Sequence, residues 1–103
     1  MHYLNISFTY KNTDISVREK LAFDSDEKKD QILRLLKSSK NIIECMVLST
    51  CNRVEVLAYT NDIKSAMTHI IRCLTVYSGV FEDELFERAD IYEDSGAVHH
   101  LFA

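Results

Sequence analysis

The sequence predicts an α+β domain built on an antiparallel sheet, with helices packed on one face of that sheet. Stretches that favour strands occur four times along the chain, and two long helical patterns separate them. The resulting order, β-α-β-β-α-β, is the split βαβ or ferredoxin-like arrangement. With 103 residues, 47% of them hydrophobic, the chain can bury one modest core, so we expect a single domain over 1–103.

The first strand and the first helix are predicted from short local patterns. The strand covers Tyr3 to Tyr10 and alternates apolar with polar residues, its apolar positions being Leu4, Ile6 and Phe8. Ser16 and Glu19 have the spacing of a capping box, in which each side chain satisfies a free backbone amide at a helix start. We therefore expect a short helix that runs through Phe23.

A second helix and a hairpin follow. Asp24 and Ser25 can cap a helix over 25–39, whose apolar residues keep helical spacing. The stretches 42–48 and 54–59 are rich in residues that favour strands. Because only five residues separate them, they predict a β-hairpin with Cys51 at its tip.

The third helix has the clearest ends. Asn61 or Asp62 can cap it, an amphipathic stripe follows, and Gly79 is a typical stop. Residues 82–88 can form one or two further helical turns. Residues 91–93 form the weakest of the predicted strands.

The chain finishes in another helical pattern. Asp94 or Ser95 can cap a helix that includes Ala97–Phe102, which stops after about two turns. So short a helix gains little from packing, and we expect the chain to be part of a longer protein.

Composition excludes several classes of protein. Twelve basic and sixteen acidic residues give a net charge of −4, which argues against nucleic-acid binding by bulk electrostatics. No apolar stretch approaches the roughly 20 residues of a membrane span, and the first residues lack a secretory pattern, so we expect a cytoplasmic protein. The three cysteines are expected as thiols, without the spacing of a zinc site. No glycine-rich phosphate loop is present.

Cys51 and Arg53 are the first candidates for chemistry. A thiolate is the reactive form of cysteine, and a neighbouring guanidinium favours it or holds a substrate carboxylate nearby. On a strand leaving the bend, residues 51 and 53 would share a face. Spacing alone nevertheless favours an inert reading, with Asn52 a turn former and Arg53 an edge-strand charge.

Histidines add one further candidate. His99 and His100 are adjacent, so only one of them can face a given site from a helix. His2 and His69 lack a partner pattern and are expected on the surface.

Three segments together resemble the glutamyl-tRNA reductase family. Val47–Val56, which contains Ser-Thr-Cys-Asn-Arg, is similar to the family signature. Ile15–Phe23 resembles the family's first helix, and Ala97–Phe102 resembles the segment with its active-site histidine. The chain departs from the family at Ser7–Asp14, where Gly-x-Asn-His-Lys-Thr-Ala-Pro is usual, so the shape of that loop is expected to differ.

The resemblance implies a function and roles for particular residues. It implies that Cys51 attacks glutamyl-tRNA to form a thioester, and that NADPH reduces the thioester to glutamate 1-semialdehyde for tetrapyrrole (porphyrin) synthesis. Thr50, Asn52 and Arg53 would bind the glutamyl group, and His100 would orient it or transfer a proton.

The resemblance also implies partners outside this chain. NADPH would be bound by a domain absent from these residues, and the full-length protein would be a homodimer. Two alternatives remain at this point. One is a ferredoxin-like binding module with an inert cysteine, and the other is a small thiol-dependent enzyme complete in itself.

Overall fold

The computed structural model describes the backbone of residues 1–102 and the side chains of residues 1–100. Its elements, in chain order, are β1 (His2–Thr9), α1 (Ile15–Leu21), α2 (Asp26–Lys37), β2 (Ile42–Ser49), β3 (Arg53–Thr60), α3 (Ile63–Ser78), α4 (Glu82–Arg88), β4 (Asp90–Glu93) and α5 (Ser95–Phe102). Each predicted strand and helix is therefore present, with ends within about two residues of the prediction.

The strands form one sheet in the order β2-β3-β1-β4, and every neighbouring pair is antiparallel. The predicted α+β class and the antiparallel sheet are thus confirmed. The register places Ser7 opposite Glu55 across β1 and β3, and Asn5 opposite Tyr92 across β1 and β4.

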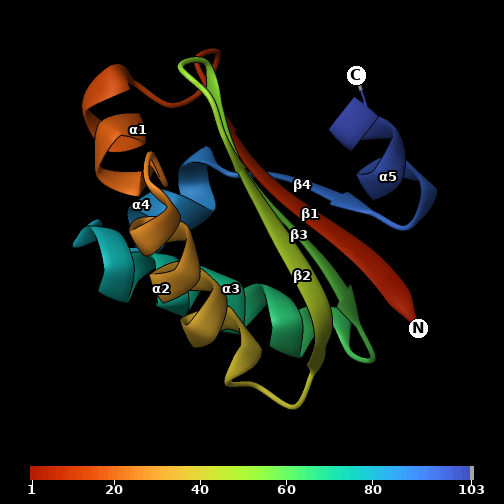
Figure 1. Ribbon diagram of the computed structural model, residues 1–103. Helices are drawn as coiled ribbons and strands as arrows, with labels where there is room; N and C mark the ends of the chain where they lie inside the picture. The colour runs from red at the N-terminus through yellow and green to blue at the C-terminus, as the bar shows by residue number, and fades with distance from the viewer. Residues whose placement is uncertain (103) are drawn as a thin grey trace.

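The hydrophobic core lies on one face of this sheet. Helices α1 to α4 cover that face (Figure 1). The two central strands contribute alternating residues that are almost completely buried there: Leu4, Ile6, Phe8, Val54, Val56 and Ala58. This alternation is the pattern from which the first strand was predicted.

The last helix, α5, lies on the opposite face (Figure 1). It contacts β1 and β4, and its Ala97 is fully buried. The prediction that the helices pack on one face is therefore wrong for α5. The physical reason is that β1 is buried on both faces: Asn5 and Ser7 point away from the apolar core, yet neither is exposed to solvent. A short helix thus covers polar side chains.

The helix ends follow the sequence with one exception. Ser25 caps α2, Asp62 caps α3, and Gly79 ends α3 with a left-handed φ of 79°. At α1 the cap is Asp14, which accepts from the amide of Val17 at 3.2 Å. The expectation that Ser16 caps this helix is wrong, because the helix has already begun at Ile15.

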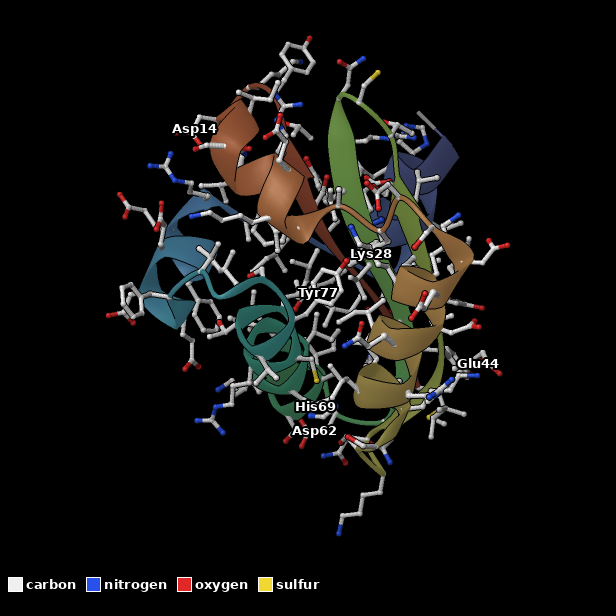
Figure 2. All side chains as sticks on the ribbon, turned by 60° about the vertical axis from the view of Figure 1, so that its left-hand side comes forward. Asp14, Lys28, Glu44, Asp62, His69 and Tyr77 are labelled. Atoms are coloured by element: carbon white, nitrogen blue, oxygen red, sulfur yellow. The ribbon has the colours of Figure 1, made fainter. Side chains whose placement is uncertain are left out.

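The charge of Asp14 explains why it caps α1 well. The hydrogen bond from Val17, followed by one from the Ser16 hydroxyl, lowers the pKa of the Asp14 carboxyl. Ser16 therefore donates to the capping carboxylate from inside the helix. Figure 2 shows Asp14 at the start of α1 and Asp62 at the start of α3.

His69 lies between α3 and α2, half-buried (Figure 2). Its Nε2 atom is 3.1 Å from the carbonyl oxygen of Leu35 and 3.0 Å from that of Leu36. The expected surface position of His69 is therefore wrong, since the ring contacts the last carbonyl groups of α2. By contrast, His2 is exposed, as expected.

Among the described residues, no helix combines the length and the apolar character needed to cross a membrane.

Candidate functional site

The hairpin tip between β2 and β3 is held by its own backbone and by one hydroxyl. The amide of Thr50 donates to the carbonyl oxygen of Arg53 at 2.9 Å. The Thr50 hydroxyl accepts from the amides of Asn52 and Arg53, both at 3.3 Å. Thr50 therefore shapes the turn that presents Cys51.

Two neighbouring segments anchor the tip from outside. The amide of Tyr10 donates to the carbonyl oxygen of Asn52 at 3.0 Å, which joins the tip to the end of β1. Arg18 on α1 donates through Nη1 to the carbonyl oxygen of Cys51 at 2.6 Å, and through Nε to that of Thr13 at 3.1 Å. Sequence reasoning assigned no role to Arg18, because a backbone carbonyl as partner leaves no pattern in the side chains.

The three thiols differ in accessibility and in proton affinity. Cys51 is exposed, whereas Cys45 is half-buried and Cys73 is buried. Burial raises the pKa of the Cys45 thiol, and it raises that of Cys73 to about 11. Within the described chain, the Cys51 thiol has no hydrogen-bond or ion-pair partner. Cys51 is therefore the most accessible of the three thiols.

Two pockets flank the hairpin tip. The first, here called the α1 pocket, measures about 470 Å³. Its lining includes Ile15, Arg18, Glu19, Asp24, Thr50 and Cys51.

The second, here called the β4 pocket, measures about 350 Å³. Its lining includes Lys11, Asn52, Arg53, Asp90, Tyr92 and His100. The chain thus places the residues nominated from the sequence on two sides of one turn.

The expectation that Cys51 and Arg53 share a face differs from this arrangement. Cys51 lines the α1 pocket and Arg53 lines the β4 pocket. The reason is that Cys51 lies in the bend before β3 begins at Arg53, so the alternation of a strand does not relate the two side chains.

A buried carboxylate organises the β4 pocket. Glu55 is 1% exposed, and its Oε1 lies 2.8 Å from His100 Nε2. Its Oε2 lies 3.6 Å from Arg53 Nε. Arg53, together with His100 when that ring is protonated, offsets a charge that would otherwise be costly to bury. Neither contact has hydrogen-bond geometry, so both carboxylate oxygens are buried without a hydrogen bond. Sequence reasoning missed Glu55, because a glutamate in a strand normally reads as a solvent-facing residue.

The sheet also settles which of the two adjacent histidines faces the pocket. His99 is exposed, whereas His100 stacks on Tyr92 with ring centroids 4.2 Å apart. His100 Nε2 also lies 3.4 Å from the Ser7 hydroxyl. His100 therefore lines the β4 pocket with Nε2 facing Glu55 and Ser7.

The described residues lack two patterns typical of metal and dinucleotide sites. They contain no group of three histidine, cysteine or acidic side chains placed to hold a metal. The two glycines lie at the end of α3 and within α5, so neither forms the glycine-rich turn between strand and helix that receives a pyrophosphate.

These features define a class: an α+β domain that presents an accessible cysteine on an anchored turn between two polar pockets. Residues 6–103 match the family model described as "Glutamyl-tRNAGlu reductase, N-terminal domain". The chain belongs to this family.

Full-length relatives agree with the family match. The chain is 76% identical over 103 residues to a glutamyl-tRNA reductase of Campylobacter concisus and 60% identical to one of Campylobacter hominis. Both matches cover 100% of this chain and 24% of the relative, so the chain spans about a quarter of their length.

A solved structure agrees as well. The glutamyl-tRNA reductase from Methanopyrus kandleri aligns with a TM-score of 0.62 and 25% identity. The alignment covers 97% of this chain and 21% of that one.

Proposed function

We propose that residues 1–103 form the catalytic domain of a glutamyl-tRNA reductase, with Cys51 as the acceptor of the glutamyl group. The observation that carries the proposal is the exposed Cys51 thiol on an anchored turn, in a chain of this family. A nucleophile needs both access and a fixed position.

The proposed step is an acyl transfer. The Cys51 sulfur, as thiolate, attacks the ester carbonyl carbon of glutamyl-tRNA, and a sulfur–carbon bond forms. The bond from that carbon to the ribose oxygen breaks, and the released oxygen takes a proton. The product is a glutamyl thioester and free tRNA. No oxidation state changes in this step.

The reduction implied by the family name needs a hydride donor, which we propose is NADPH. The described residues contain no glycine-rich turn between a strand and a helix, so no part of the reduction is assigned to them. We propose that a further domain of a longer protein binds NADPH.

The β4 pocket is the proposed site of the glutamyl side chain. Lys11 and Arg53 outnumber the one acidic lining residue, Asp90, and a carboxylate is attracted to such a lining. We propose that Arg53 binds the carboxylate and that Asn52 orients the group from the same pocket. Thr50 would contact the group from the α1 pocket, on the other side of the turn. His100 would orient the substrate or assist proton transfer.

Four broader assignments accompany this proposal. The sheet order β2-β3-β1-β4, with crossovers through α1–α2 and through α3–α4, supports a ferredoxin-like topology. A cytoplasmic location and a homodimeric full-length protein are proposed from the family resemblance. The same resemblance supports a place in tetrapyrrole synthesis.

The decisive experiment separates acyl transfer from reduction. The full-length protein is mixed with glutamyl-tRNA in the absence of NADPH, then analysed by mass spectrometry and by the amount of tRNA released. We expect one added glutamyl group on the peptide that contains Cys51.

Two substitutions make the result specific. Cys51→Ser should release no tRNA above the uncatalysed rate, whereas Cys45→Ser should behave as the wild type. Release of tRNA by Cys51→Ser at the wild-type rate would refute the proposed role and favour a binding module with an inert cysteine.

A further inference from the structure

The two pockets beside the hairpin tip differ in charge. The β4 pocket is lined by more basic than acidic side chains, as described above. The α1 pocket is lined by two carboxylates, Glu19 and Asp24, and by one guanidinium, that of Arg18. The surroundings of Cys51 therefore attract anions on the side of the β4 pocket and repel them on the side of the α1 pocket.

The free acceptor in the α1 pocket is Glu19. Arg18 already donates through Nε and Nη1 to two backbone carbonyls, and Asp24 is paired with Lys28 at 3.0 Å. Glu19 is exposed, and its carboxylate has no hydrogen-bond or ion-pair partner within the described part of the chain. Such a group accepts hydrogen bonds from hydroxyl or amino groups and repels phosphate.

The same pocket has an apolar wall. Ile15, the first residue of α1, is 62% exposed although it is a large aliphatic residue. Ala22, which follows the last residue of α1, also lines the pocket. An exposed apolar side chain beside a polar pocket gives a planar ring a surface to pack against. Its volume of about 470 Å³ lies within the range of small-molecule sites.

We propose that the α1 pocket receives the 3′-terminal nucleoside of the tRNA, which is the leaving group of the acyl transfer. The inference rests on the proposed function. Attack at the ester carbonyl by Cys51 requires the glutamyl group and the ribose to extend in different directions from the carbon under attack. With the glutamyl carboxylate in the basic β4 pocket, the ribose extends toward α1.

The chemistry of a terminal nucleoside matches the lining. The ribose hydroxyl that is not esterified donates to the Glu19 carboxylate, and the base packs against Ile15. No phosphate needs to enter, because the terminal nucleoside carries its phosphate on the 5′ side, away from the ester.

Two esters with the same acyl group test this inference. One is 3′-O-glutamyladenosine and the other is the α-ethyl ester of glutamate, and the rate of acylation of Cys51 in the full-length protein is measured for each. Glu19→Gln should slow acylation by the adenosine ester about tenfold, as expected for the loss of one hydrogen bond to a charged group. Acylation by the ethyl ester should be unchanged.

Matched variants complete the design. Glu87→Gln makes the same chemical change at an exposed residue of α4 outside both pockets, and it should alter neither rate. Ile15→Ser should slow the adenosine ester alone. Adding a 5′-phosphate to that ester should bring no gain.

The possible failures are distinguishable. If Glu19→Gln slows both esters equally, the α1 pocket holds the glutamyl group and the inference is wrong. If it slows neither, the nucleoside does not bind there and the inference is also wrong. Modification by either ester that persists in Cys51→Ser would instead overturn the proposed function.

Discussion

The clearest consequence of the structure is that one thiol of three should react with an alkylating reagent. The perturbation is brief treatment of the native protein with iodoacetamide near neutral pH, compared with the same treatment in concentrated urea. Because unfolding removes the differences in burial, all three cysteines should react at similar rates in urea.

The magnitude for Cys73 follows from its environment. Burial raises the pKa of this thiol from 9.0 to about 11, so its thiolate fraction near neutral pH falls about a hundredfold. The side chain is also only 7% exposed, which adds the cost of local opening. Native Cys73 should therefore react at least about a hundredfold more slowly than the same cysteine in urea.

The other two cysteines should both react faster than Cys73 in the native protein. Cys45 is half-buried and its pKa is raised in the same direction, so it should be slowed to an intermediate extent. Cys51 is exposed and should react in the native protein about as fast as in urea, or faster. The assay is peptide mass spectrometry with isotopically distinct reagents for the native and denatured samples.

Native labelling of Cys73 or Cys45 as fast as that of Cys51 would show that burial does not control these thiols. Cys51→Ser serves as the control, because it should abolish the fast native labelling and leave the slow labelling unchanged.

Three further predictions concern stability, each measured by urea unfolding. Glu55→Ala should destabilise the domain by about 3 kcal/mol, because it leaves Arg53 and His100 without the carboxylate between them, and unchanged stability would contradict the ion pairs. Between pH 9.0 and about 11 the free energy of unfolding should fall, since the unfolded Cys73 thiol loses its proton at a lower pH than the folded one. Cys73→Ala should lack this component of the fall. Gly79→Ala should cost about 1 kcal/mol because φ is 79° there, whereas Gly96→Ala, without a positive φ, should cost nothing.

Local patterns predicted the elements of this domain well. The alternation in β1 and the stop at Gly79 depend on residues close together in the sequence, so the sequence shows them directly. The cap of α1 was missed by two residues, because Asp14 and Ser16 can both accept an amide hydrogen bond and only the start of the helix decides between them.

The site was predicted in part. The resemblance named Cys51, Arg53 and His100, and the structure places all three beside the hairpin tip. It did not indicate that the thiol and the guanidinium line different pockets. Nor did it indicate Arg18, whose partner is a backbone carbonyl 33 residues away in sequence.

The sequence by itself determined the family, the order of strands and helices, and the turn that carries the cysteine, because these depend on motifs and short-range periodicity. The tertiary structure alone decided that α5 covers the second face of the sheet and brings His100 to Glu55. The physical reason is distance along the chain: a strand's own pattern shows which residues alternate, but whether both of its faces are buried depends on a helix that begins some 90 residues later.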